Sequence, residues 1–171
     1  GPSDTITGKG EKAAAPAGTG EAKGDNPKKP KSQSADNGYT LYIRNLNSGS
    51  TDSVMFVTEY LFAEEAEKLM YATTGDGNGA EPGVAIIDLG KGEKNLLYTG
   101  KAKYRQLTID KKGARAAFIL SFDEKDKAGN TFSLCSWNGK GLAAVAATQG
   151  TAGLPAGWIV NENARLMFAE N

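Results

Sequence analysis

The chain is a succession of short apolar stretches separated by polar turns. Stretches of about four to eight residues that are rich in aromatic and β-branched side chains, and bounded by Gly, Asn or Asp, are typical of β-strands. Helix competes only over 62–70, which is rich in Ala, Glu, Lys and Leu, and we prefer strand–turn–strand there because the matching stretches elsewhere are not helical. Strands are expected at 39–45, 53–57, 58–63, 68–73, 84–89, 95–99, 105–110, 114–122, 131–137, 142–148, 157–160 and 164–170.

One apolar motif recurs along the chain. The motif Lys-Leu-Met-Tyr-Ala at 68–72 returns as Arg-Leu-Met-Phe-Ala at 165–169, and a degenerate copy, Arg-Ala-Ala-Phe-Ile, lies at 115–119. Lys68 and Arg115 are 47 positions apart, and Arg115 and Arg165 are 50 positions apart. A repeat of about 40–50 residues with four short antiparallel strands is typical of a β-propeller blade.

The turns repeat with the strands. One series of turns falls at 64–67, 110–113 and 161–163, and a second at 47–49, 90–92 and 138–141. Gly and Asn suit these positions because tight hairpin turns need positive φ. The pattern predicts an all-β fold, a partial β-propeller of about three four-stranded antiparallel blades over 38–171. A β-sandwich is the alternative, favoured by the number of strands but not by their spacing.

An open arc of blades leaves apolar faces uncovered at its two ends. The chain is therefore expected to be a piece of a longer protein, with the rest of the propeller as its partner and with possible self-association through the open edges.

Residues 1–37 have a different composition. They contain no Leu, Val, Phe, Tyr, Trp or Met and a single Ile, Ile6. Such a segment buries too little apolar surface to offset its chain entropy, so 1–37 is expected to be a disordered low-complexity segment. Gly1-Pro2 is typical of the scar left by removal of a tag, and the basic cluster 28–31 is interpreted as solvated linker.

Composition excludes several classes of function. The formal net charge is zero, so no electrostatic argument favours nucleic acid or an anionic membrane surface. No apolar run approaches the roughly 20 residues of a membrane span. The chain has no His, which excludes Ser-His-Asp and Cys-His machinery and zinc sites built on His. Cys135, the single cysteine, lies in a strand-like run and is interpreted as a packed, inert thiol.

The remaining candidates are better explained by structure than by chemistry. The segment 76–79 resembles the start of a calcium loop, but the EF-hand spacing fails because Glu81 stands where Gly is needed. The acidic segment 123–126 is interpreted as a solvated turn, the glycines at 75–83 and 90–92 as turns rather than phosphate cradles, and Trp137 and Trp158 as blade packing. No catalytic, cofactor-binding or metal-binding residue is expected.

The blade pattern resembles the N-terminal propeller of bacterial prolyl oligopeptidase-family serine peptidases. The residues that carry the resemblance are 39–46, Val-Thr-Glu-Tyr at 57–60, and the strand–turn–Arg-Leu-Met-Phe pattern of 159–168. In that family the catalytic Ser, Asp and His lie in a following α/β-hydrolase domain, with the nucleophile in a G-x-S-x-G elbow. This chain has no such elbow, so no catalytic residue is carried over.

The resemblance implies a function for the whole protein. It implies a non-catalytic domain of a secreted or periplasmic serine peptidase, acting as lid and substrate gate for peptides, with 1–37 containing a truncated loop insertion of the first blade. The alternative is a propeller of the TolB type, which shares this blade pattern and serves protein–protein interaction without an associated peptidase.

Overall fold

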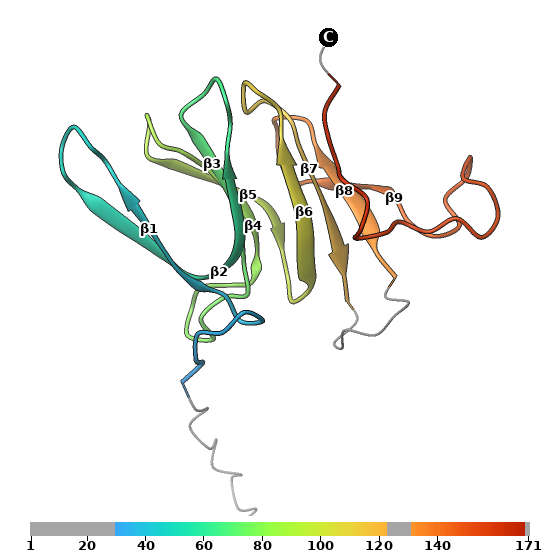
Figure 1. The fold of residues 1–171 in the computed structure, drawn as a ribbon, viewed down its shortest axis with the longest axis horizontal. Coiled ribbons are helices and arrows are strands. Elements are labelled where there is room, and N and C mark those ends of the chain that lie inside the picture. The colour runs from blue at the N-terminus through green and yellow to red at the C-terminus, as the bar shows by residue number, and fades with distance from the viewer. Residues whose placement is uncertain (1–29, 123–130, 170–171) are drawn as a thin grey trace, which may run out of the picture.

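The computed structural model describes residues 30–122 and 131–169, and this part of the chain is all-β, with no helix. It forms two antiparallel sheets in which neighbouring strands are also consecutive in sequence (Figure 1). The first sheet consists of β1 (Tyr39–Arg44), β2 (Thr51–Phe62), β3 (Lys68–Thr73), β4 (Gly83–Asp88) and β5 (Glu93–Thr99). The second consists of β6 (Lys103–Ile109), β7 (Ala116–Ser121), β8 (Ser133–Trp137) and β9 (Ala144–Ala147).

Strand β2 belongs to two pairings that meet at Val57. Strand β1 pairs with β2 from Thr51 to Val57, and β3 pairs with β2 from Val57 to Phe62. Both ladders shift register next to this point, and Phe56 has a φ of 57°, which a bulky residue adopts rarely. The bend turns the β1–β2 hairpin toward one face of β3 and β4 (Figure 1). The strands predicted separately at 53–57 and 58–63 are therefore one strand, and their separation was wrong.

Gly38 lies directly against this bend. Its φ is +90°, and a Cβ at this position would come within 2.5 Å of the Phe56 carbonyl carbon and oxygen. Any side chain here would push β1 away from the bent segment of β2, so glycine is required by close backbone approach as well as by its φ.

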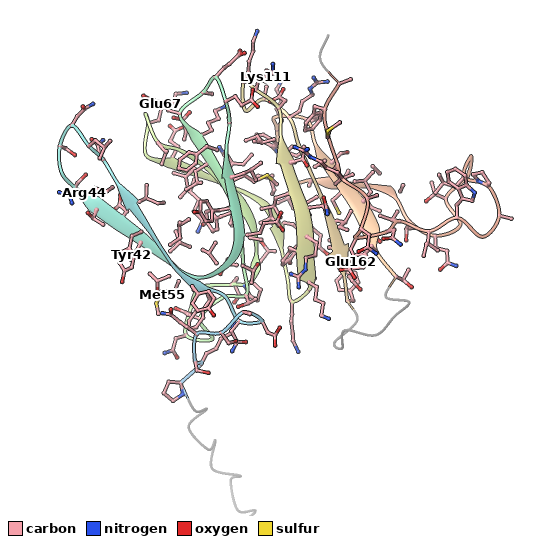
Figure 2. All side chains as sticks on the ribbon, in the orientation of Figure 1. Tyr42, Arg44, Met55, Glu67, Lys111 and Glu162 are labelled. Atoms are coloured by element: carbon pink, nitrogen blue, oxygen red, sulfur yellow. The ribbon has the colours of Figure 1, made fainter. Side chains whose placement is uncertain are left out.

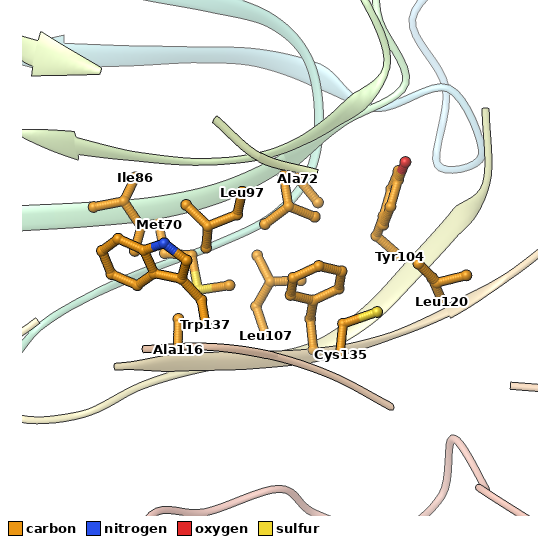
Figure 3. Close-up of a cluster of buried hydrophobic side chains, with 12 residues drawn as sticks. Met70, Ala72, Ile86, Leu97, Tyr104, Leu107, Ala116, Leu120, Cys135 and Trp137 are labelled. Carbon is orange, nitrogen blue, oxygen red and sulfur yellow. The ribbon is translucent and has the colours of Figure 1, made fainter. Parts of the chain in front are cut away.

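Two apolar cores follow from this arrangement. The larger core lies between the two sheets, where side chains of β3, β4 and β5 meet those of β6, β7 and β8 (Figure 3). The smaller core lies between the β1–β2 hairpin and the other face of β3 and β4. Both β3 and β4 consequently bury side chains on their two faces. The smaller core contains Val57, Tyr71 and Ala85, with Leu41, Val54 and Ile87 packed against them.

Most of the local predictions are confirmed. The all-β class, the strand–turn–strand reading of 62–70, and the turns at 90–92 and 138–141 agree with the structure. Asn45 Oδ1 accepts hydrogen bonds from Asn47 N at 2.9 Å and Ser48 N at 3.0 Å and so caps the first of the predicted hairpin turns.

The prediction of strands at 157–160 and 164–170 was wrong for the residues that the structure describes. Over 157–169 there is no strand, and the pairing is limited to one isolated bridge between Phe132 and Val160. The motif at 165–169 has strand-forming residues, but the described residues give it no backbone partner, and a strand without a ladder is not stable. Residue 170 and the charged loop 123–130 lie outside the described residues.

Candidate functional site

The two sheets meet where β2 runs beside β6. Glu59 Oε1 on β2 accepts a hydrogen bond from Leu107 N on β6 at 2.9 Å. This amide is available because β6 is irregular between Arg105 and Thr108, where Gln106 has a φ of 55°. Strand β6 is an edge strand of its sheet. The Glu59 carboxylate, which comes from the neighbouring sheet, accepts a hydrogen bond from one of the backbone N–H groups along this edge.

The environment of Glu59 changes its acidity. Burial between the sheets raises the pKa of the Glu59 carboxyl, against the opposing effects of the Leu107 and Gln106 amides and of the Arg105 charge. Desolvation disfavours the charged form, whereas donors and cations favour it. Glu59 is therefore a half-buried acid at a sheet–sheet junction, and sequence analysis did not identify it.

The turns at the end of this junction also contact one another. Glu65 N donates to Lys111 O at 2.8 Å, and Lys68 Nζ donates to Gly113 O at 3.0 Å. A Cβ on Gly113 would come within 2.5 Å of Lys68 Cδ, so the lysine stem lies flat on this glycine. Lys68, which opens the motif at 68–72, therefore reaches the turn at 110–113.

A groove of about 840 Å³ runs between β2, β6 and the C-terminal segment 162–169. Side chains of the second sheet hold this segment: Gln106 Nε2 donates to Glu162 O at 2.8 Å, and Thr108 Oγ1 donates to Leu166 O at 3.1 Å. The Arg115 guanidinium lies 5.3 Å from the centre of the Phe168 ring, within the range of a cation–π contact. The segment is fixed by side chains rather than by a backbone ladder. Figure 2 shows Glu162 beside the second sheet, far from Tyr42 and Met55 on the β1–β2 hairpin.

Lys31 makes a second cluster of polar contacts, which sequence analysis missed. Its Nζ donates to Thr74 O at 2.9 Å, to Gly75 O at 2.8 Å and to Thr74 Oγ1. The ammonium also lies 4.8 Å from the centre of the Phe56 ring. Burial lowers the pKa of Lys31, and the charge of Asp76 acts in the opposite direction. Lys31 is therefore docked rather than solvated, and no signal in its low-complexity surroundings pointed to this.

Among the residues that the sequence singled out, Cys135 and Trp137 are packed as predicted. Cys135 is fully buried in the larger core, and burial raises the pKa of its thiol to about 11, which disfavours the reactive thiolate. Trp137 is buried as well, and its Nε1 donates to Gly141 O at 3.0 Å. Trp158 is 63% exposed, so the prediction that it packs within a blade was wrong.

The loop 76–79 is organised by its own hydrogen bonds. Asp76 Oδ1 accepts from Asn78 N at 2.7 Å and from Ala80 N at 2.9 Å, and these bonds lower the pKa of the Asp76 carboxyl. Within residues 30–122 and 131–169 no cluster of three metal-ligating side chains occurs. The described chain likewise contains no helix that could cross a membrane. The acidic segment 123–126 lies outside the described residues.

The geometry thus offers two sites, the sheet–sheet groove at β2 and β6 and the Lys31 cluster. Neither brings together a nucleophile, a base and an oxyanion donor of the kind that acyl transfer needs. Comparisons of the chain with protein families, with curated proteins and with solved structures gave no match.

Proposed function

We propose that residues 38–169 are consecutive blades of an open β-propeller and that they serve as a non-catalytic lid and substrate gate of a secreted or periplasmic serine peptidase. The observation that carries the blade assignment is the bend of β2 at Phe56. The bend ends one antiparallel pairing at Val57 and begins the next, so that the β1–β2 hairpin lies face to face with β3 and β4. Face-to-face stacking of short meanders at a fixed sequence interval is how a propeller buries its blades.

The repeated basic residue supports the same proposal. Lys68 contacts Gly113, and Arg115 contacts Phe168, so the first residue in each of the first two motif copies touches the stretch that follows it. A contact repeated between successive units is expected where each unit packs only against its neighbours.

The outward faces of the two end layers also support the proposal. Tyr42 and Met55 on the β1–β2 hairpin, and Leu142 and Val145 at β9, are exposed apolar side chains. Further blades or a partner domain would cover them and remove this apolar surface from water.

The peptidase role is supported by the sequence resemblance at 39–46 and 57–60. The chain has no His, and its single thiol is buried with a raised pKa. The catalytic groups would therefore come from an α/β-hydrolase domain that acts as a partner of this one, with peptides as substrates.

The coding sequence downstream of Asn171 tests the peptidase role. A G-x-S-x-G elbow followed by Asp and His, with prolyl-peptide hydrolysis that disappears when the elbow Ser is replaced by Ala, would support it. We expect the chain alone to be inactive. A reading frame that continues through further blades without an elbow would reject the peptidase and leave the blades in place.

In that second case the chain would be an interaction propeller of the TolB type. The observation that favours this alternative is Trp158, a large aromatic side chain exposed beside Ile159. Exposed aromatic residues are enriched at protein–protein contacts.

A further inference from the structure

The loop after β3 binds an ammonium group that comes from a distant part of the chain. The three N–H donors of the Lys31 ammonium are directed at three oxygens, those of the Thr74 carbonyl, the Thr74 hydroxyl and the Gly75 carbonyl. Lys31 is 43 positions from Thr74 in sequence. A lysine ammonium has three donors and no acceptor, so the loop satisfies its hydrogen-bonding capacity.

These oxygens are positioned by contacts that do not involve Lys31. Thr74 N donates to Phe56 O at 3.0 Å, and Gly75 N donates to Thr73 Oγ1 at 3.0 Å. Gly75 has a φ of +68°, and a Cβ there would come within 2.4 Å of Ala80 O. The loop would therefore keep its two carbonyls pointing the same way without the lysine, which makes it a preorganised site.

The Phe56 ring forms the apolar wall of this site. The ring is buried, and its position is fixed by the bend of β2. The Lys31 ammonium lies 4.8 Å from the ring centre, which is a cation–π distance. The nearby Asp76 carboxylate adds a favourable charge.

We propose that Phe56, Thr74 and Gly75 form a binding site for a primary alkylammonium group, which Lys31 occupies as an internal ligand. The chemistry selects this class of ligand. A tetrahedral ammonium on an alkyl stem matches three converging oxygens beside an aromatic face, whereas a planar guanidinium presents its donors in one plane.

The proposal implies a site that Lys31 opens and closes. When Lys31 withdraws, or loses its charge by acetylation, the same oxygens become available to a lysine side chain or an amino terminus from another molecule. This inference rests on the contacts of one loop and is independent of the proposed propeller and peptidase.

The test is chemical rescue in the full chain. Lys31→Ala removes three methylene groups and the ammonium, which n-propylammonium replaces. We expect n-propylammonium to shift the Gly75 and Asp76 amide resonances of Lys31→Ala saturably, with an apparent affinity about ten-fold or more above that for the wild type, because the internal ligand competes in the wild type. Lys31 lies outside both cores, so the variant is expected to fold.

Three comparisons make the result decisive. Thr74→Val in the Lys31→Ala background removes one acceptor and should weaken the binding, whereas Lys68→Ala, which vacates a site with a single carbonyl at 3.0 Å, should create no saturable site. Equal affinity in wild type and Lys31→Ala, or no saturable shift in either, would overturn the proposal. Equal binding of n-propanol, tetramethylammonium or potassium ion by Lys31→Ala would also overturn it, because each lacks the alkylammonium donors.

Discussion

Strands β3 and β9 are both short and built mainly from apolar residues, yet their surroundings are opposite. In β3 every residue after Lys68 is buried, whereas in β9 every residue before Ala147 is exposed. The difference lies in the number of layers, because β3 has the second sheet on one face and the β1–β2 hairpin on the other. Strand β9 is an edge strand with Val145 directed to solvent. Burial here depends on what covers a strand more than on the strand's own residues.

Removing the buried Tyr71 ring should show the difference between β3 and β9 most clearly. Tyr71→Ala empties part of the smaller core and should lower the free energy of unfolding by about 3–5 kcal/mol. Val145→Ala, the corresponding truncation to alanine on β9, should lower it by less than about 1 kcal/mol. Urea denaturation of the two variants measures both values. Similar losses would mean that β3 is not covered on both faces.

The bend that covers β3 can be weakened at Gly38. Gly38→Ala places a Cβ against the Phe56 carbonyl and should cost about 1–3 kcal/mol in the free energy of unfolding. Gly49→Ala is the control, because Gly49 also has a positive φ, +73°, but has open space around it. It should cost only the backbone strain, about 1 kcal/mol. Equal costs in urea denaturation would show that close approach at the bend is unimportant.

The sheet–sheet junction should respond to pH through Glu59. Its pKa in the folded state lies above the ordinary value, so its contribution to stability is present at low pH and is lost as pH rises through the folded pKa. Glu59→Gln keeps an acceptor for Leu107 N. Because the glutamine side chain does not ionise, the variant does not lose stability in this way as pH rises. The thermal midpoint of Glu59→Gln relative to wild type should therefore rise between pH 4 and pH 7.

A carboxylate outside the junction provides the control for this pH effect. Glu93 at the start of β5 is exposed, so Glu93→Gln removes a carboxylate without touching the junction and serves as the matched variant. A Glu59→Gln profile that runs parallel to the wild-type profile would contradict the junction assignment.

The smallest effect on stability is expected on the open face. Val145→Lys should change the free energy of unfolding by less than about 0.5 kcal/mol, because the side chain is 57% exposed. A charge on this edge strand should, however, reduce any self-association, as charged residues do at natural sheet edges. Sedimentation velocity of the wild type and the variant measures it, and a large loss of stability would show that β9 is covered in solution.

Sequence alone determined the local features of this protein. Short runs rich in aromatic and β-branched residues predicted β1 to β9 within a few residues, with the exception that β2 was divided at Val57. Gly and Asn placed the hairpin turns, because positive φ is a property of single residues. The burial of Cys135 could also be expected from its strand-like surroundings.

The candidate sites depended on contacts that sequence does not display. Lys31 meets Thr74 and Glu59 meets Leu107 across 43 and 48 positions of the chain, respectively. The segment 157–169 has strand-forming residues but no strand in the structure, because a strand forms only where another backbone pairs with it. Periodicity records which side of a strand is apolar, whereas only the tertiary arrangement decides whether that side is covered.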